Sequence, residues 1–358
     1  KKDLDVEIRT CIDYFADMLH QQSQYTAFQQ RMAAMKKDLD AKKAAATKNE
    51  AGKIEVDGEE YTPTVKAYKN HEFLMGSDAR PLRILCEYME TKRRLAKHNV
   101  DATILFFASA RARHPDDHAC LLKGAQTKLQ ACKEGTPEYA SAMAKVQRLE
   151  RTKWMCGMYE QTRTLARRLA QWGVDRNKQG LKRVSVASGG GPGLMEAANR
   201  GASEVKGASS VGMGISLPFE AGLNPYVTND LAFEYHYFFT RKYWMANTCH
   251  ALVASPGGFG TCDELFELMT LIQTGKHPDI PIVLFSKKFW SKVINWDALV
   301  EFGTVSPADV KKFIITDSID EAYDHITKYL DSVERDLMEK NSKAKEEAEK
   351  ERGDYTQA

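Results

Sequence analysis

The sequence predicts an α/β fold: a doubly wound, Rossmann-like parallel sheet with a helical N-terminal extension. Two observations indicate it. Short apolar runs recur between residues 102 and 285, and segments with helical periodicity lie between them. Strands of a parallel sheet read as continuous apolar runs because helices cover both faces. Strands that alternate with helices favour such a sheet over an antiparallel one.

Residues 1–98 are predicted to form the helical extension. Apolar residues recur there at intervals of three and four, the spacing of one helical face: Ile8, Cys11, Ile12, Phe15 and Leu19. A Lys/Ala-rich run follows, then turn residues in "EVDGEEYTPTV", and residues 70–98 again have helical spacing. Packing or dimerisation is the expected role of this arm.

Residues 99–331 are predicted to form the Rossmann-like domain. Its expected strands are 102–108, 184–188, 209–216, 251–255 and 281–285, and its expected helices are 154–173, 193–204, 237–249, 261–275 and 289–302. The charged stretch at about 112–153 is predicted to be a helical insertion, and "FEYHYFF" to be core and rim packing. Residues 332–358 form a charged tail, expected to be a solvated helix that frays.

Composition disfavours several classes of partner and site. Lys and Arg number 51 and Asp and Glu 49, a net charge of +2, so no strong field favours nucleic acid or a membrane. No apolar run is long enough to span a bilayer. The sequence has no HExxH motif or His/Cys cluster, so we expect no metal.

Seven cysteines, with no CxxC pair and no Cys/His spacing suited to zinc, indicate free thiols in a reducing compartment. We therefore expect a cytoplasmic protein. Organellar import stays open, because a targeting segment would precede Lys1.

Two glycine-rich turns each link a predicted strand to a predicted helix: "GGGPG" at 189–193 and "PGGFG" at 256–260. Glycine lets the backbone turn sharply and bring its N–H groups to a ligand. The helix N-terminus that follows adds donors and partial positive charge. Since parallel strands end at one edge of the sheet, both turns are expected in one crevice that binds phosphate.

Neither turn is a common nucleotide motif. Walker A requires Gly-Lys-Ser/Thr, and "GFGTCD" has no lysine. The dinucleotide fingerprint GxGxxG, counted from Gly189, meets Leu194 where the third glycine belongs. Kinase, ATPase and NAD-enzyme interpretations are therefore disfavoured, and a phosphorylated small molecule is the expected ligand.

Glu264 has two interpretations. "TCDE" matches a capping box, with Thr261 as N-cap and Glu264 reaching back to it. A carboxylate in the first helical turn would also face the crevice and could act in catalysis. The pattern leaves both roles open.

Other polar residues flank the predicted crevice. Arg241 and Lys242 lie in an otherwise aromatic and apolar helix, and a guanidinium can hold a carboxylate or a phosphate with two N–H groups. Glu196 is either a surface residue or a complement to the helix dipole. Loops after the first and third strands and a later helical position add Ser109, Arg111, Glu220, Asn224 and Thr270.

Five stretches together resemble the lonely-guy family: "SGGGPGLMEAANRGA", "LPFE", "NPY", "FFTRK" and "PGGFGTCDELFELMTLIQTGK". This family comprises cytokinin riboside 5′-monophosphate phosphoribohydrolases and related nucleoside-monophosphate nucleosidases, long labelled lysine decarboxylases. The resemblance covers roughly residues 102–300. Ala108 stands where many relatives have glycine.

The resemblance implies a usually dimeric enzyme without metal or organic cofactor. It would hydrolyse the N-glycosidic bond of a purine nucleoside 5′-monophosphate, such as AMP or a cytokinin riboside 5′-monophosphate. By position, Arg241 and Glu264 match the catalytic pair. The resemblance also matches Gly257, Gly258, Gly260 and Thr261 to the phosphate turn, Glu220 to a substrate-contacting glutamate and Lys242 to the lysine beside the catalytic arginine. Residues of the two turns and the positions near the crevice complete the predicted substrate- and phosphate-binding set: Ser109, Arg111, Gly190, Gly191, Phe259 and Thr270.

Two other functions stay open, and so does the identity of the base. A non-catalytic nucleotide sensor would use the same crevice, with the extension as an effector arm. An amino-acid decarboxylase would usually need pyridoxal phosphate on a Schiff-base lysine. Lys242 is the only lysine beside the predicted site residues, and nothing near it suggests a clamp for a pyridine ring.

Overall fold

The computed structural model describes residues 37, 54–56, 59–61, 64–217 and 222–354. The predicted helix that contains Ile8 and Leu19 lies outside these residues. Contacts divide the chain into two compact units, Lys1–Arg80 and Pro81–Ala358. Among the described helices, none is both long and apolar enough to cross a membrane.

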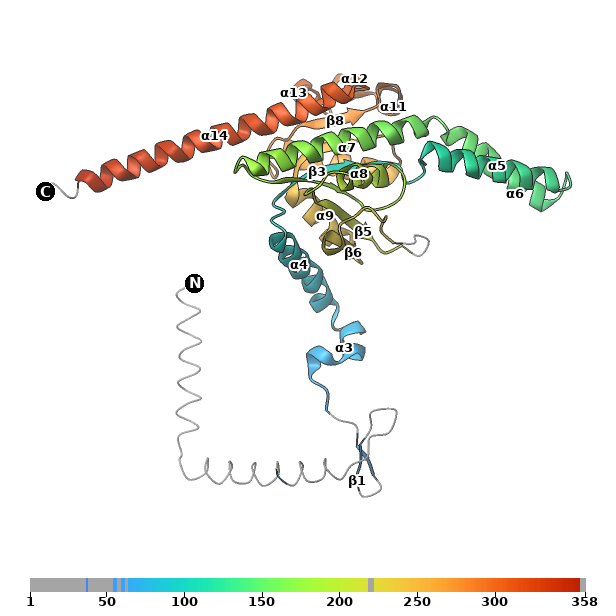
Figure 1. The fold of residues 1–358 in the computed structure, drawn as a ribbon, viewed down its shortest axis with the longest axis horizontal. Helices are drawn as coiled ribbons and strands as arrows, with labels where there is room; N and C mark the ends of the chain where they lie inside the picture. The colour runs from blue at the N-terminus through green and yellow to red at the C-terminus, as the bar shows by residue number, and fades with distance from the viewer. Residues whose placement is uncertain (1–36, 38–53, 57–58, 62–63, 218–221, 355–358) are drawn as a thin grey trace. The chain divides into compact units, whose positions relative to one another are not determined.

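The first unit contains a hairpin that the sequence did not predict. β1 (Ile54–Val56) pairs antiparallel with β2 (Glu59–Tyr61), where only turn residues were expected. The 3₁₀-helix η1 (Ala67–Lys69) and helix α3 (His71–Met75) follow (Figure 1). The predicted continuous helix at 70–98 is divided, because α3 ends at Met75 and α4 (Arg80–Lys97) begins as a separate helix.

The second unit is built on seven parallel strands, which confirms the predicted fold class. In chain order they are β3 (Ala102–Phe107), β4 (Val184–Ser188), β5 (Ser210–Ile215), β6 (Ala232–Tyr235), β7 (Cys249–Ala254), β8 (Ile282–Phe285) and β9 (Phe313–Thr316). Their order in the sheet is β6-β5-β4-β3-β7-β8-β9. Every neighbouring pair is parallel.

The five predicted strands match β3, β4, β5, β7 and β8, whereas β6 and β9 were missed. Both missed strands lie at the edges of the sheet and are four residues long. In β6, buried and more exposed residues alternate, so "FEYHYFF" lacks the continuous apolar run by which a central strand is recognised. The predicted core and rim packing is confirmed, since Phe233, Tyr235 and Tyr237 are buried and Phe238 and Phe239 are exposed. The sequence did not predict that this run forms an edge strand leading into a helix.

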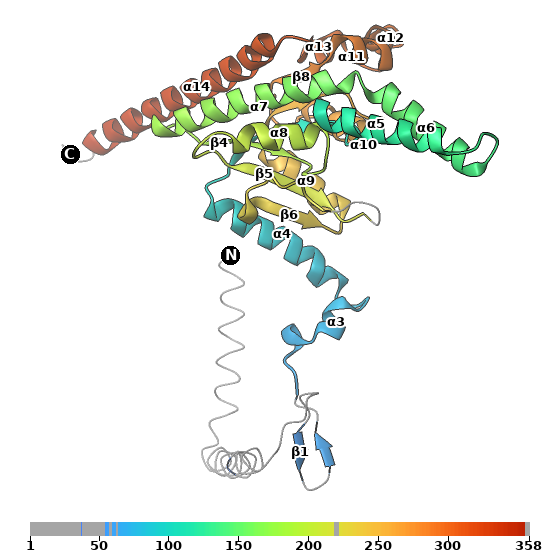
Figure 2. The ribbon, with the colours of Figure 1, turned by 45° about the vertical axis from the view of Figure 1, so that its right-hand side comes forward.

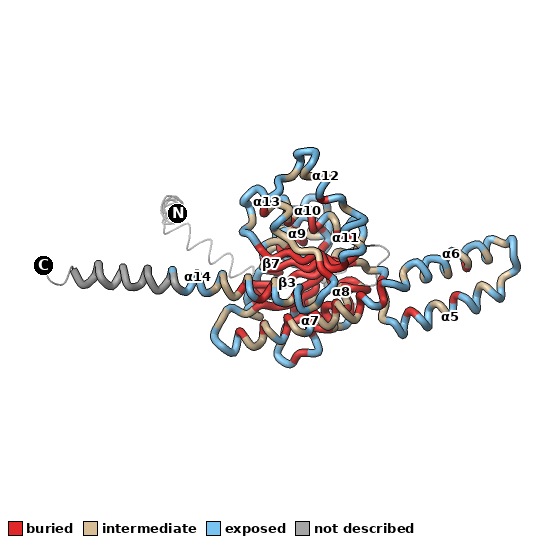
Figure 3. The backbone as a smooth tube through the Cα atoms, turned by 90° about the horizontal axis from the view of Figure 1, so that it is seen from above, coloured by how far each residue is buried: buried red, intermediate tan, exposed pale blue. Residues whose placement is uncertain are grey.

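Helices cover both faces of this sheet (Figures 1 and 3). On one face, α7 (Met155–Lys178), α8 (Leu194–Ser203) and α14 (Ile319–Asp354) pack against Ile104 and Phe106. On the other, α9 (Phe238–Thr248), α10 (Phe259–Gln273), α11 (Lys287–Val293) and α12 (Trp296–Glu301) pack with Leu105 and Phe107. Successive side chains of β3 thus alternate between the two faces, as a strand requires.

Helix α4, which the sequence assigned to the N-terminal extension, packs on the sheet domain beside β6 (Figure 2). Its Leu95 is part of the buried core. The Thr91 hydroxyl lies 2.9 Å from the Tyr235 hydroxyl, and Arg94 donates to the carbonyl of Ala232 at 2.7 Å.

The stretch 112–153 contains two paired helices, α5 (Pro115–Ala131) and α6 (Pro137–Thr152), which extend away from the sheet (Figure 3). The predicted helix at 289–302 is two helices, α11 and α12, because Asn295 caps α12 by accepting from Ala298 N at 3.0 Å. After the short helix α13 (Pro307–Val310), α14 runs without a break through residue 332, where the charged tail was predicted to begin.

Candidate functional site

The strand order places a topological switch point between β3 and β7. From β3 the chain builds outward through β4, β5 and β6, then returns to place β7 on the other side of β3. Open α/β sheets bind ligands at such a switch point, outside the carboxyl ends of the strands. Here Ser255 N donates to Phe107 O and Ser109 N donates to Pro256 O, both at 2.9 Å. The "PGGFG" turn therefore begins at the switch point.

This turn is shaped by close packing at one glycine and by open space at two others. A Cβ at Gly257 would lie 2.0 Å from Thr261 Oγ1, whereas one at Gly258 or Gly260 would meet nothing within 4 Å. Phe259 is 96% exposed. Since the first N–H groups of α10 have no carbonyl partner within the helix, they can donate hydrogen bonds to an anion that enters this space.

The "GGGPG" turn packs directly on the loop after β3. Gly193 has a φ of +80°, and a Cβ there would lie 2.4 Å from Ser109 O. Leu194 N, the first residue of α8, donates to that same oxygen at 3.1 Å. The two predicted turns and Ser109 thus lie together at one edge of the sheet.

A buried network of side-chain amides fixes the "GGGPG" turn. Only one of its two asparagines was predicted from the sequence. Asn224 Nδ2 donates to Gly190 O at 3.0 Å and to Asn199 Oδ1 at 2.9 Å. Asn199 Oδ1 also accepts from the Ser188 hydroxyl at 2.6 Å. Asn224 was expected near the crevice, and Asn199 was overlooked. Asn199 could have been recognised as a polar residue among small apolar residues in "EAANRGA", on the face of α8 that is buried.

The structure brings Arg241 of α9 into contact with Glu264 of α10. Arg241 is 9% exposed and Glu264 5% exposed, and Arg241 Nη1 lies 3.2 Å from Glu264 Oε1. Arg241 Nε donates to Met213 O at 2.8 Å. This bond to β5 orients the guanidinium toward the carboxylate.

The predicted capping box is wrong. Helix α10 begins at Phe259, with Gly258 as its N-cap and no capping by a side chain. Thr261 is therefore already inside the helix, and Glu264 lies beyond its first turn. Two roles were left open for Glu264. Because the helix starts at Phe259, Glu264 cannot be the third residue after the N-cap, and the capping role is excluded.

Burial raises the pKa of Glu264 to about 7, and the nearby charges of Arg241 and Lys242 lower it by less. A carboxyl that titrates near neutrality can hold or accept a proton at the pH of a cell. Such a shift, at a crevice and beside a specific cationic partner, is typical of functional residues.

Lys242 lies next to the pair and turns to other carboxylates. Its Nζ is 2.8 Å from Asp263 Oδ2 and 3.0 Å from Glu267 Oε2. Burial lowers the pKa of Lys242, but these two hydrogen bonds raise it above its ordinary value.

The remaining predicted residues are placed differently. The Arg111 backbone N–H donates to Ser109 Oγ at 3.1 Å, so the backbone of Arg111 belongs to the same loop after β3 as Ser109. Glu196 accepts from the Tyr159 hydroxyl at 2.8 Å. Thr270 is not brought to the crevice: it lies almost two turns beyond Glu264 and donates to Phe266 O within α10. Glu220 lies outside the described residues.

No group of three or more His, Cys, Asp or Glu side chains in the described part of the chain is arranged to hold a metal ion.

Comparison with known proteins supports the family resemblance. Residues 195–326 match the model of a family described as possible lysine decarboxylase. A probable cytokinin riboside 5′-monophosphate phosphoribohydrolase of Oryza sativa subsp. japonica is 31% identical over 91 residues, 25% of this chain and 43% of the relative. Two enzymes named cytokinin riboside 5′-monophosphate phosphoribohydrolase also match. The enzyme of Arabidopsis thaliana is 39% identical over 69 residues, which are 19% of this chain and 32% of the relative. The enzyme of Mycobacterium tuberculosis is 33% identical over 84 residues, which are 23% of this chain and 44% of the relative.

The chain thus spans less than half of the length of these curated relatives. The matched family segment contains Arg241, Glu264 and the "PGGFG" turn. The resemblance to the lonely-guy family is confirmed.

Proposed function

We propose that this protein hydrolyses the N-glycosidic bond of a purine nucleoside 5′-monophosphate, AMP or a cytokinin riboside 5′-monophosphate. The products are the free base and ribose 5-phosphate. The observation that carries the proposal is the buried contact between Arg241 and Glu264, close to a helix N-terminus suited to phosphate. Names of relatives over the matched segment support the same reaction.

In this proposal the 5′-phosphate is held by the "PGGFG" turn and the N-terminus of α10. Its binding energy positions the ribose C1′ near Glu264. When the bond from C1′ to the base nitrogen breaks, its electron pair leaves with the base, which takes up a proton. The ribosyl centre becomes oxocarbenium-like, and a carboxylate beside it stabilises that charge.

Glu264 then accepts a proton from the water whose oxygen bonds to C1′ and releases it to solvent, which replaces the proton that the base takes up from solvent. Arg241 keeps the carboxylate oriented and favours its charged form, since its own Nε is fixed by Met213 O. These roles extend glycosidase chemistry to a leaving group that is a base.

The pH dependence follows from the pKa of Glu264. Because the reaction uses the ionised carboxylate, we expect kcat/KM for AMP to fall about tenfold per pH unit below about 7 and to level off above it. The measurement is a pH profile of base release. The substrate phosphate titrates near pH 6, so the binding of ribose 5-phosphate over the same range is the control. A rate that is flat from pH 5 to 8 would contradict the assigned role.

The phosphate anchor is tested by omitting the phosphate. We expect adenosine to be hydrolysed at least about a hundredfold more slowly than AMP, in kcat/KM, because two or more charge-assisted hydrogen bonds are lost. Chromatographic detection of free base from a panel of nucleosides and their 5′-monophosphates measures this and identifies the base. Equal rates for AMP and adenosine would refute the anchor, and tight AMP binding without base release would favour a sensor.

We also propose that the protein acts as a cytoplasmic homodimer. Exposed apolar side chains lie on two neighbouring helices, Leu85 and Met89 on α4 and Phe239 and Tyr243 on α9. The rings of Tyr88 and Tyr243 are 5.4 Å apart, which joins the two helices into one face. A face of this kind is typical of a subunit contact. The six cysteines in the described part of the chain are free, which suits a reducing compartment.

A further inference from the structure

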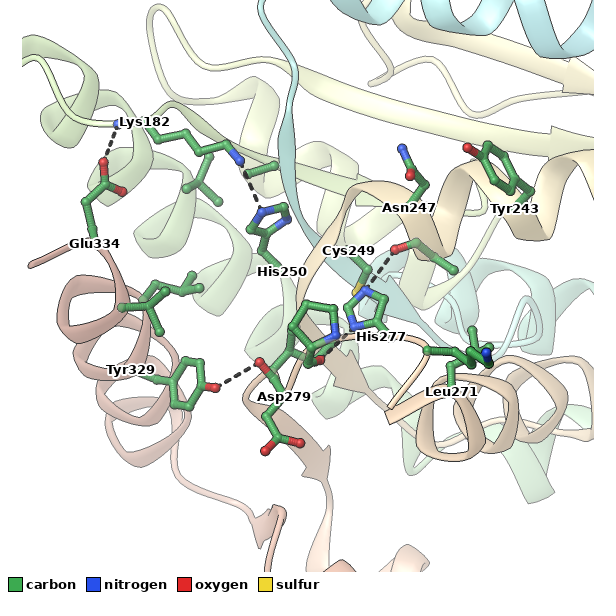
Figure 4. Close-up of a pocket in the computed structure, with 18 of the residues that line it drawn as sticks. Lys182, Tyr243, Asn247, Cys249, His250, Leu271, His277, Asp279, Tyr329 and Glu334 are labelled. Carbon is green, nitrogen blue, oxygen red and sulfur yellow. Dashed lines mark hydrogen bonds between the residues drawn. The ribbon is translucent and has the colours of Figure 1, made fainter. Parts of the chain in front are cut away.

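A cavity lies at the edge of the sheet opposite to the glycine turns. Its volume is about 700 Å³, and its wall includes Ala102, Val184 and Cys249, the first residues of β3, β4 and β7. Helices α9, α10 and α14 and the segment 276–280 also line it (Figure 4). Arg241 and Glu264 do not line this cavity. The cavity therefore does not contain the proposed catalytic pair, although Lys242, one of the predicted substrate-binding residues, does line it.

The wall is mostly apolar and large enough for a small organic molecule. Aliphatic and aromatic side chains from four parts of the chain form it: Ala246, Leu271, Ile280, Tyr329, Leu330 and Val333. Cavities of about 300–1,000 Å³ with apolar walls and a few polar groups are typical of sites for small molecules.

The carboxylates in the wall already have cationic partners. Glu267 pairs with Lys242 at 3.0 Å, and Asp279 pairs with Lys312 at 2.9 Å. Glu334 Oε2 pairs with Arg176 Nη2 at 2.6 Å. Each of these acids therefore has a cationic partner, although Arg176 also pairs with Asp331 and Lys242 also pairs with Asp263.

Two cations in the same wall, Lys182 and Lys276, are not balanced in this way. Within the part of the chain that the structure describes, no carboxylate forms an ion pair with either. The ammonium of Lys182 instead lies 3.2 Å from His250 Nε2 (Figure 4). Lys182 and Lys276 therefore present ammonium groups that no carboxylate of the described residues contacts directly.

His250 fixes the Lys182 ammonium and leaves its charge in place. His250 Nδ1 lies 2.9 Å from Thr248 O and donates to it, so Nε2 is free to accept from Lys182. Burial lowers the pKa of His250, which keeps the ring neutral. The Lys182 backbone N–H donates to Glu334 Oε1 at 3.2 Å. The lysine is therefore held at both ends, with N–H bonds left for a ligand.

We propose that this cavity binds an amphipathic organic anion. An apolar body would lie on the aliphatic and aromatic wall, and a carboxylate would accept from Lys182 Nζ. The unpaired lysines favour a negative head group, and the apolar wall favours burial of the rest of the molecule.

The experiment is a calorimetric titration of the full chain with sodium octanoate, compared with octylammonium chloride. The two probes share an apolar chain and carry opposite charge. We expect saturable binding of one octanoate per chain, and at least tenfold weaker binding of octylammonium. Lys182→Ala should weaken octanoate binding about tenfold, the value of one charge-assisted hydrogen bond. The matched control Lys288→Ala removes an exposed lysine outside the cavity and should leave the binding unchanged.

Lys182 and Lys288 are both exposed, so both variants are expected to fold, and circular dichroism checks this. Three results would each overturn the proposal: no saturable binding of octanoate, equal affinity for the two head groups, or an equal effect of the two lysine substitutions. None of these depends on base release, so the site is tested separately from the proposed reaction.

Discussion

Glu264→Gln is expected to lower base release from AMP by about a thousandfold while the fold is kept. The substitution preserves size and removes the negative charge that stabilises the ribosyl centre and accepts the proton of water. Loss of one such preorganised group typically costs a factor of 10²–10³ in turnover. Single-turnover base release measures the effect. Glu264→Asp keeps the charge and shortens the reach, so it should retain partial activity.

The stability of the wild-type protein relative to this variant depends on pH in a defined direction. The pKa of Glu264 is about 7 in the folded protein and about 4.3 in an unfolded chain. Between these values the folded state binds the proton more tightly, so this group's contribution to stability falls as pH rises from about 4.3 to 7 and is constant outside that window. At pH 6 the wild-type carboxyl is mostly neutral, like Gln, and the two melting temperatures should agree within about 3 °C.

The matched control is Glu301→Gln, an exposed carboxylate on α12, which should leave base release unchanged. If the Glu264→Gln protein melts normally and retains near wild-type turnover, the negative charge of Glu264 is not needed for catalysis. A protein that is destabilised at pH 6 yet active would assign Glu264 a structural role alone.

Arg241→Ala is expected to lower base release by about a hundredfold or more. The guanidinium both orients Glu264 and lowers its pKa. Its removal should therefore also move the acid limb of the pH profile to higher pH, which a merely structural residue would not do. Arg241→Lys should recover little, because an ammonium cannot donate to Met213 O and Glu264 Oε1 in the same geometry.

The double variant Arg241→Ala/Glu264→Gln tests whether the two residues act together. Since the two residues are in contact, the loss of transition-state stabilisation in the double variant should be smaller than the sum of the losses in the two single variants. Arg168→Ala, which removes a surface arginine paired with Asp320 at 2.6 Å, is the control. Strictly additive losses would show that Arg241 and Glu264 act independently. A folded Arg241→Ala protein with normal turnover and an unchanged pH profile would show that Arg241 has no role in catalysis.

The sequence predicted those parts of the fold in which local pattern and tertiary position agree. The central strands β3, β4, β5, β7 and β8 are continuous apolar runs because both their faces are covered. The edge strands β6 and β9 are partly exposed, so their pattern is ambiguous without their neighbours. Helix α10 starts two residues before the expected position, because Gly258 fills the N-cap that Thr261 was expected to occupy.

Site residues on glycine turns were predictable from local sequence, and contacts between distant residues were not. Arg241 and Glu264 were identified singly, but their contact spans 23 residues and depends on how α9 and α10 pack. The Asn199–Asn224 network depends on burial between two segments in the same way. The cavity around Lys182 has no sequence signature at all, since its wall combines strand starts with one face of α14.

One measurement tests the central claim most directly: the identity of the products that the wild-type protein forms from AMP. The proposed reaction predicts adenine and ribose 5-phosphate in equal amounts, with neither formed by the Glu264→Gln protein purified in the same way. Adenosine and inorganic phosphate as products, or equal adenine release by the two proteins, would contradict it.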